Sequence, residues 1–412
     1  MFYERIRDLT VSFPFYFLID DMKVRSILDT DLYLFSVSYY FMKQYPDASG
    51  TLAFNDRNKT IYSNEDLKNL KIELEALKTL ELSKDEFEWC KKNIHYIPEV
   101  YWEWLKGFHF DPEKINLWLD EDSHLHIEVT DKLYRTALYE IPILATVSGL
   151  MHETELINVN HSEVLERLNK KVQMINKYGL RIGDMGCRRR ASYEIQEEVV
   201  GFMAKNIYPE LFTGTSNVYL AMKFGVKPLG TMSHFMVMFN MAHHGYRMGN
   251  YYTMETWADT YHGDLGIYLT DTVGSEAFFK NFSKKHAKLF DGIRQDSGDE
   301  YKFTDRAIQR YKELGIDPTT KTIVFSNALT VEKFKDIEEY CRGKIKCSAG
   351  IGTSLTCDVP GVKPCNIVMK LKECRMNDKQ PMIPCIKLSD DLGKYTGDPE
   401  EIKIAKKTLG IL

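Results

Sequence analysis

Polar side chains that could do chemistry recur between residues 183 and 353. Seven short segments carry them, each after an apolar run and before a helical pattern: 183–188, 214–217, 230–234, 270–272, 294–299, 326–327 and 350–353. In an α/β barrel the carboxyl ends of all strands meet at one rim, where their loops converge on a ligand. We therefore expect these segments to form one site.

The segment Arg294-Gln295-Asp296-Ser297-Gly298 combines a guanidinium group with a carboxylate. The guanidinium fork suits a planar carboxylate or a phosphate. Asp296 could accept hydrogen bonds from sugar hydroxyls or hold a metal ion through water. An ion pair between Arg294 and Asp296 that only fixes its own loop explains the segment equally well.

His234 follows Gly230-Thr231 and precedes the apolar helical pattern of residues 236–241. A histidine at such a junction can act as a nucleophile or a proton carrier, or can simply lie at the start of the helix. Taken alone, the last of these is favoured. The pairs His243-His244 and His124/His126 lack a third ligand, so we expect both to be structural.

Gly350-Ile351-Gly352-Thr353 could bring backbone N–H groups and a hydroxyl close to a phosphate. A tight turn without a ligand explains an isolated pair of glycines better. The position of these residues late in the series favours the phosphate, because barrel enzymes often bind phosphate there.

Arg188-Arg189-Arg190 precedes the amphipathic stretch 191–205. Three consecutive side chains cannot all point one way, so at most two could reach a ligand. The alternative is a solvated helix start, balanced by Glu194, Glu197 and Glu198.

Residues 386–397 contain an apolar run followed by paired acids. Lys387 and Ser389 interrupt the apolar pattern of a buried strand. We therefore predict that this segment does not contact a substrate.

The elements that must position these groups fall into two regions. Residues 180–370 alternate apolar runs with helical patterns, as in a parallel sheet or barrel. Residues before 135 mix a helical pattern at 67–82 with a strand pattern at 125–129. The tail contains strand candidates at 367–371 and 386–388 and a helix near 400–407, and we expect it to pack on the first region. A length of 412 residues suits two domains.

Composition narrows the possible partners. The formal net charge of -5 gives no general reason to bind nucleic acid or an anionic membrane. The eight cysteines show no zinc-finger spacing, which favours free thiols, although disulfides or a metal site among the C-terminal six stay open. Residues 11–19 are interrupted by Pro14 and are too short to span a bilayer, so we expect a cytoplasmic protein with a lead segment of unknown use at residues 1–22.

Taken in order, the motifs resemble the nicotinate phosphoribosyltransferase family, one of the type II phosphoribosyltransferases. The similarity runs from Asp29-Thr30-Asp31-Leu32-Tyr33 to beyond Asp390, covering nearly everything after residue 22. Its most specific parts are Gly214-Thr215-Ser216-Asn217-Val218, Gly230-Thr231-Met232-Ser233-His234, Leu269-Thr270-Asp271-Thr272, Arg294-Gln295-Asp296-Ser297-Gly298-Asp299, Phe325-Ser326 and Gly350-Ile351-Gly352-Thr353-Ser354-Leu355-Thr356.

The resemblance implies an α/β fold with two parts. Residues 136–367 would form an incomplete, irregular α/β barrel that carries the phosphoribosyl site. Residues 1–135, completed by 368–412, would form a second α+β domain. The chain would work as a homodimer with its active sites at the interface, taking nicotinate, phosphoribosyl pyrophosphate and ATP.

The resemblance also implies roles for individual residues. Tyr33 would enter the neighbouring subunit's site and stack on the pyridine ring, Met185 would line the ring, Arg294 would hold the nicotinate carboxylate and Arg188 the phosphates. Asp296 and Asn327 would bind ribose hydroxyls, with Gly350, Gly352 and Thr353 around the 5′-phosphate. His234 would be phosphorylated by ATP, and Asp271 would assist a Mg²⁺ ion directly, through water or through pyrophosphate.

Ser216 carries the expected base specificity. In the related nicotinamide enzyme an acidic residue at this place accepts the amide N–H, and a carboxylate there would repel nicotinate. The neutral serine favours the acid. Nicotinamide or quinolinate as the base, and a non-catalytic nucleotide-binding relative, stay as alternatives.

Two residues depart from the family pattern. Met185 replaces the usual Phe, which thins one aromatic wall of the base site. Asn327 replaces the usual Asp and so lacks its charge near the sugar. We expect either change to lower affinity without removing a step.

Overall fold

The computed structural model describes residues 22–391 and 393–411, so the expected lead segment lies outside the described residues up to residue 21. Its larger sheet has six parallel strands in the order β5-β4-β9-β8-β7-β6. The strands are β4 (Ile182–Asp184), β5 (Phe212–Thr215), β6 (Ile267–Leu269), β7 (Gly292–Gln295), β8 (Thr322–Phe325) and β9 (Lys346–Ile351). Because all of them run in the same direction, their carboxyl ends lie at one edge.

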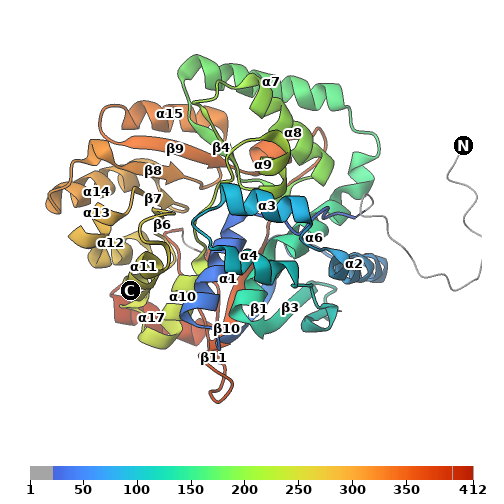
Figure 1. The fold of residues 1–412 in the computed structure, drawn as a ribbon, viewed down its shortest axis with the longest axis horizontal. Coiled ribbons are helices and arrows are strands. Elements are labelled where there is room, and N and C mark those ends of the chain that lie inside the picture. Colours follow the sequence, from blue (N-terminus) through green and yellow to red (C-terminus); the bar gives the residue numbers. More distant parts are fainter. Residues whose placement is uncertain (1–21, 392, 412) are drawn as a thin grey trace, which may run out of the picture.

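Helices precede and follow these strands, and Figure 1 shows α7, α14 and α15 at the periphery of the sheet. They are α7 (His161–Tyr178), α8 (Tyr193–Asn206), α9 (Val218–Phe224), α10 (His234–His244), α11 (Gly249–Tyr261), α12 (Ser275–Asn281), α13 (Lys284–Leu289), α14 (Glu300–Glu313), α15 (Val331–Cys341) and α16 (Thr353–Thr356). Local sequence sets their starts. Asp299, for example, accepts hydrogen bonds from the N–H groups of Tyr301 and Lys302 at the start of α14.

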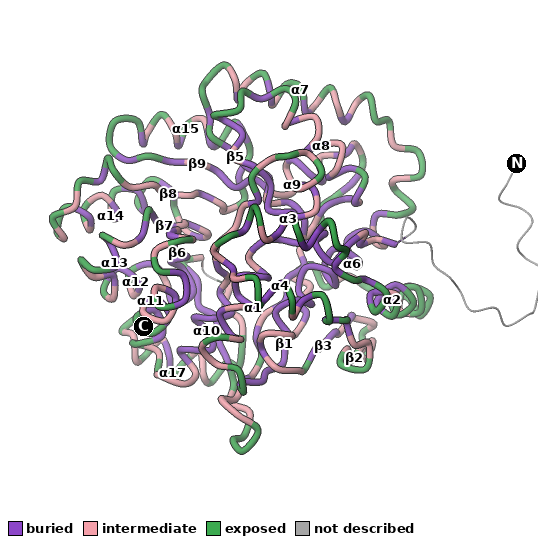
Figure 2. Tube along the Cα trace, viewed as in Figure 1, coloured by how far each residue is buried: buried purple, intermediate pink, exposed green. Residues whose placement is uncertain are grey.

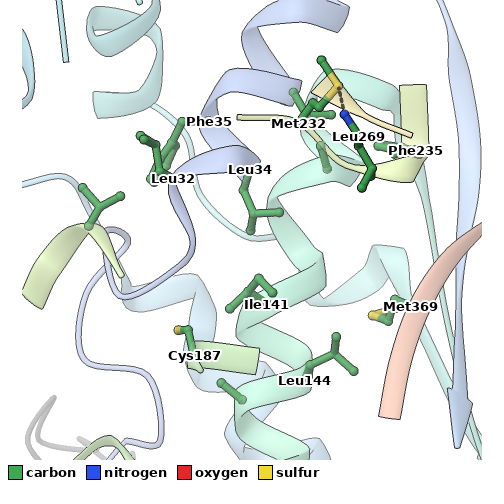
Figure 3. Packing of buried hydrophobic residues seen from close by; sticks show 14 of the residues in the cluster. Leu32, Leu34, Phe35, Ile141, Leu144, Cys187, Met232, Phe235, Leu269 and Met369 are labelled. Atoms are coloured by element: carbon green, nitrogen blue, oxygen red, sulfur yellow. Dashed lines mark hydrogen bonds between the residues drawn. The ribbon is translucent and has the colours of Figure 1, made fainter. Parts of the chain in front are cut away.

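The outer strands β5 and β6 are not paired with each other, and an irregular segment at residues 228–232 contacts both. Pro228 forms an isolated parallel bridge with Thr215 of β5. Thr231 Oγ1 donates to the carbonyl of Ile267 in β6 at 2.8 Å. Figure 3 shows Met232 Sδ beside the N–H of Leu269 in the same strand, 3.5 Å away. The expected incomplete, irregular α/β barrel is confirmed.

The second sheet is antiparallel, with the order β11-β10-β1-β3-β2. Its strands are β1 (Ser49–Asp56), β2 (Ile115–Leu119), β3 (Leu125–Lys132), β10 (Ile367–Arg375) and β11 (Ile383–Pro384). Helices α1 (Leu32–Gln44), α2 (Asn64–Ala76), α3 (Lys84–Asn93), α4 (Glu99–Lys106), α5 (Leu133–Thr136) and α6 (Glu140–Leu156) accompany it. Because the C-terminal strand β10 pairs with β1, both ends of the chain build this sheet.

The rest of the tail returns to the barrel. The N–H of Leu388 donates to the carbonyl of Thr272 at 2.9 Å. Tyr246, which follows α10, donates a hydrogen bond to Glu401 of the last helix, α17 (Pro399–Leu409). The tail therefore contacts both parts of the fold, and the exact domain boundaries near residues 135 and 367 stay a prediction.

A buried ion pair ties the N-terminal segment to the barrel. The guanidinium of Arg190 contacts both carboxylate oxygens of Asp29, at 2.6 and 2.8 Å, and both side chains are 1% exposed or less. Asn217 donates to the same carboxylate at 2.7 Å. The alternative of a solvated helix start is therefore wrong for Arg190, because its counter-charge comes from Asp29 and not from the nearby glutamates.

The apolar residues form one continuous cluster through both parts of the chain. Figure 3 shows Leu34 of α1 and Ile141 of α6 within this cluster, and Figure 2 shows the buried trace running through the centre of the molecule. All eight cysteines carry free thiols, as the sequence favoured. Within residues 22–391 and 393–411, no helix has the length and apolar composition that crossing a membrane requires.

We expect Arg190→Leu to lower the free energy of unfolding by about 3–5 kcal/mol, because it leaves the Asp29 carboxylate buried without its partner. Chemical denaturation followed by circular dichroism measures this change. Arg342→Leu is the matched control: Arg342 pairs with Glu338 on the surface and is 63% exposed, so its loss should cost less than about 1 kcal/mol. Equal effects of the two substitutions would contradict a special role for the buried pair.

Candidate functional site

Three of the expected groups meet at the carboxyl edge of the parallel sheet. One ligand atom each from His234, Asp271 and Asp296 lies within 4.8 Å of the others. They come from the start of α10, the loop after β6 and the loop after β7. The predicted convergence of distant loops is therefore confirmed for these residues.

Arg294 and Asp296 form the ion pair that the sequence allowed, with Nη2 3.0 Å from Oδ1. Ser326, which follows β8, accepts from Arg294 Nε at 2.8 Å and donates to Asp296 at 2.5 Å. Burial alone would raise the pKa of Asp296, but Arg294 and His234 hold it well below its usual range. The pair thus fixes its own loop and also presents an ionised carboxylate beside His234.

His234 is the first residue of α10, which Ser233 caps. Its Nδ1 lies 2.8 Å from Thr272 Oγ1, and its Nε2 lies 3.5 Å from Asp296 Oδ2. Burial, reinforced by the charge of Lys387, lowers the pKa of His234 to about 4. The imidazole is therefore neutral near pH 7 and keeps one nitrogen lone pair for nucleophilic attack.

The same group of residues fits a divalent cation. Asp271 Oδ1 is buried, has no hydrogen-bond partner in the described chain, and lies 3.9 Å from His234 Nδ1. Its other oxygen accepts from Ser297 Oγ at 2.8 Å. Carboxylate oxygens suit Mg²⁺, and an unpartnered buried oxygen calls for a positive charge. Asp271 and Asp296 are the residues that would hold the ion.

Five cations lie close together where the second sheet meets the barrel: Arg57, Arg188, Arg189, Lys370 and Lys387. Their charges act on one another, because burial and the neighbouring cations lower the pKa of Lys370 to about 7 and that of Arg189 to about 9. Mutual repulsion of this kind is relieved when an anion binds. The cluster is thus suited to a ligand with several phosphate groups.

Segment 386–397, which we set aside at the sequence level, lies at this site. Lys387 Nζ is 3.2 Å from Asp271 Oδ2, and its side chain is 6% exposed. Asp391 accepts from the N–H of Gly298 at 3.0 Å. The strand expected at 386–388 is reduced to an isolated bridge between residues 387 and 396. Although Lys387 interrupts the apolar pattern, its side chain is buried. Contact with a substrate stays untested.

Tyr33 lies at the start of α1, where a Cβ atom on Gly230 would be 3.1 Å from its backbone nitrogen. Burial and the neighbouring Glu140 and Asp31 raise the pKa of its phenol. Its entry into a neighbouring subunit's site stays a prediction.

Ser216 does not stand alone at its position. Its hydroxyl donates to the carboxyl of Asp31 at 2.5 Å, and the two side chains are 3% and 6% exposed. An acidic group is therefore present after all, supplied by a distant part of the sequence. A neutral Ser216 by itself therefore does not decide between nicotinate and nicotinamide.

The remaining expected residues lie at the ends of β4, β8 and β9. A Cβ atom on Gly350 would lie 2.2 Å from Met185 Sδ, and one on Gly352 would lie 3.2 Å from the Met185 carbonyl. Close packing against Met185 thus explains both glycines, while phosphate binding by Gly350, Gly352 and Thr353 stays a prediction. The side chain of Asn327 lies 3.5 Å from both the Gly298 carbonyl and Lys394 Nζ.

Comparison with known proteins agrees with this geometry. The family model described as "Nicotinate phosphoribosyltransferase (NAPRTase) family" matches residues 180–411, and that of the N-terminal domain of the same family matches residues 28–148. Nicotinate phosphoribosyltransferase of Chromohalobacter salexigens is 39% identical over 387 residues, covering 94% of this chain and 98% of its own. That of Methanosarcina mazei is 38% identical, with the same coverage of both chains.

Solved structures give the same result. The crystal structure of nicotinate phosphoribosyltransferase from Porphyromonas gingivalis matches with a TM-score of 0.92 and 43% identity, covering 93% of this chain and 99% of its own. A putative nicotinate phosphoribosyltransferase from Saccharomyces cerevisiae matches with a TM-score of 0.89 and 30% identity, covering 96% and 100%. On sequence and fold alike, this chain belongs to the nicotinate phosphoribosyltransferase family.

Proposed function

We propose that this chain joins nicotinate to phosphoribosyl pyrophosphate, giving nicotinate mononucleotide and pyrophosphate for NAD synthesis in the cytoplasm. The observation that carries the proposal is the juxtaposition of two groups at one sheet edge. The first is the hydrogen-bonded set of His234, Arg294, Asp296 and Ser326. The second is the cation cluster that includes Lys370 and Lys387. Together they suit an anionic base and a substrate rich in phosphate.

The base would lie between Tyr33 and Met185, with its carboxylate toward Arg294. Offset stacking on the tyrosine ring contributes about 1 kcal/mol beyond burial. The guanidinium of Arg294 already has Nε on Ser326 and Nη2 on Asp296, which fixes the orientation of the fork. A fixed cation lowers the entropic cost of binding a carboxylate.

Transfer requires positioning more than proton movement. The pyridine nitrogen attacks the anomeric carbon, a C–N bond forms, and the C–O bond to pyrophosphate breaks with its electron pair leaving on the pyrophosphate. The attacking nitrogen carries no proton, so no general base is needed. Asp296 and Asn327 would hold the ribose hydroxyls, while Arg188 and the other cations would stabilise the charge that develops on the leaving group.

ATP would act through His234. A neutral imidazole nitrogen attacks the γ-phosphorus, a P–N bond forms, and ADP leaves with the electrons of the broken P–O bond. Water later cleaves the phosphohistidine and releases phosphate. The lowered pKa of His234 supports this role, because an imidazolium could not attack.

Mg²⁺ would be held by Asp271 and Asp296. When bound, the ion neutralises phosphate charge on ATP and on the leaving pyrophosphate. Lys387 forms an ion pair with Asp271 and would neutralise this carboxylate when the ion is absent.

The test of the base is turnover of phosphoribosyl pyrophosphate with nicotinate, nicotinamide or quinolinate offered separately, followed by pyrophosphate release. We expect nicotinate alone to be turned over, since Arg294 supplies a cation for one carboxylate. Turnover of nicotinamide in its place would refute the assignment. No pyrophosphate release with any base would instead support a non-catalytic relative.

We expect His234→Asn to abolish stimulation by ATP while leaving slow transfer without ATP, because the variant cannot accept a phosphoryl group. The measurement is the initial rate with and without ATP, together with ³²P retained on the protein. His161→Asn is the control, since His161 is 60% exposed and pairs with Glu198 on the surface. ATP stimulation that survives in His234→Asn would show that another group accepts the phosphoryl.

We also propose a homodimer, as the family resemblance implies, in which Tyr33 of each chain enters the neighbouring subunit's site. Mixing inactive Tyr33→Ala with inactive Arg294→Ala should then restore part of the activity, because one site of the mixed dimer keeps both side chains. The measurement is the transfer rate of the co-expressed pair. No restoration would show that each chain supplies its own Tyr33.

A further inference from the structure

The carboxyl of Asp31 and the hydroxyl of Ser216 form a pair at the base end of the pocket. Their hydrogen bond is 2.5 Å long and joins the start of α1 to the loop after β5. Arg188 acts electrostatically on the Asp31 carboxyl, which in turn acts on Tyr33, two residues further along the chain. The pair therefore lies near a residue expected to stack on the pyridine and one expected to bind phosphate.

The carboxyl of Asp31 does not cap its own helix. Asp31 precedes α1, yet its side chain makes no hydrogen bond that caps the helix. Backbone hydrogen bonds already fasten this segment to the barrel: Leu32 N–H donates to Ser216 O at 2.9 Å, and Val218 N–H donates to Thr30 O at 3.0 Å. Because the backbone already joins the two segments and the acid caps no helix, its burial beside Ser216 points to a role toward the ligand.

A serine hydroxyl has a single proton to donate. When Asp31 is ionised, the Ser216 hydroxyl donates its hydrogen bond to the carboxylate. The pair can then only accept hydrogen bonds from a ligand. When Asp31 is protonated, its own O–H can donate to Ser216 Oγ, and the serine proton becomes free. The pair then offers a donor, which suits a carboxylate on the pyridine ring.

We propose that Asp31 is a positioning residue for base recognition: in its protonated form it turns the Ser216 hydroxyl into a donor for the nicotinate carboxylate, and in its ionised form it disfavours nicotinate. The inference rests on the proposed nicotinate activity with the base beside Ser216. Nicotinate binding above the pKa of Asp31 then takes up one proton from solvent.

The groups around Asp31 determine the pH at which its carboxyl loses its proton. Burial raises the pKa of Asp31 to about 6, the bond from Ser216 and the charge of Arg188 oppose the rise, and the carboxylates of Asp184 and Glu140 add to it. The charged and titratable groups that face it are Arg188 and Cys187 of the short helix Cys187–Arg189, Asp184 of β4, Glu140 of α6 and Tyr33 of α1. The donor form therefore dominates below pH 6 and is lost as the pH rises above it.

The test is the pH dependence of kcat/KM for nicotinate between pH 6 and 8 at saturating phosphoribosyl pyrophosphate and ATP. For the unaltered enzyme we expect a fall that approaches tenfold per pH unit, as loss of one proton requires. In Asp31→Asn the amide donates to Ser216 Oγ at every pH, so the profile should be flatter than that of the unaltered enzyme. Lys370 also titrates in this pH range. Its effect is the same in both proteins, so it cancels in the ratio of their kcat/KM values at each pH.

Asp122→Asn is the matched control, because Asp122 is exposed in the turn between β2 and β3 and its loss removes a carboxyl far from the pocket. It should keep the profile of the unaltered enzyme. A purely structural role for Asp31 would lower activity by the same factor at every pH, so parallel profiles for Asp31→Asn and the unaltered enzyme would overturn the proposal.

Proton uptake keeps the proposal testable even if Asp31→Asn does not fold. Calorimetric titration of the unaltered enzyme with nicotinate at pH 8, in buffers of different ionisation enthalpy, should show uptake of about one proton. Binding without proton uptake would overturn the proposal while leaving the nicotinate activity intact. Absence of nicotinate turnover at any pH would instead refute the activity on which the proposal rests.

Discussion

The buried ion pair between Arg190 and Asp29 is the constraint on which the geometry of the base pocket depends. Arg190 lies two residues after Arg188, and Asp29 lies just before Asp31 and Tyr33. Because a bidentate guanidinium fixes both distance and orientation, this contact sets how the N-terminal segment meets the barrel loops. Asn217 joins the same carboxylate and extends the constraint to Ser216 beside it.

Charge balance governs the other end of the pocket. Asp271 and Asp296 face a neutral His234, while Arg294 and Lys387 each neutralise one carboxylate. Burial, reinforced by the charge of Lys387, disfavours a further positive charge there, which is why the imidazole stays unprotonated. Phosphate ligands would complete this balance by meeting cations whose repulsion is otherwise unrelieved.

Sequence patterns predicted the features that depend on neighbouring residues along the chain. Apolar runs followed by Gly, Ser, Thr and Asp marked the strand ends, and the convergence of His234, Asp271 and Asp296 followed from parallel topology. Lys370 and Arg57 were missed, because each reaches the site only through tertiary packing. The segment of Lys387 was set aside, because a lysine within an apolar run argued against a buried strand. The contact of Asp31 with Ser216 joins residues 185 positions apart, and no pattern in a single sequence indicates such a pair.

The position of β10 beside β1 affects how the protein folds during translation. Strand β1 pairs on one side with β3, which follows it closely, and on the other side with β10, which is synthesised near the end of the chain. Lys370 of that strand and Lys387 beyond it belong to the pocket, so a ribosome must release almost the whole polypeptide before the phosphate end of the pocket can exist. Contacts so distant in sequence also form slowly, which leaves β1 with an unpaired edge during translation.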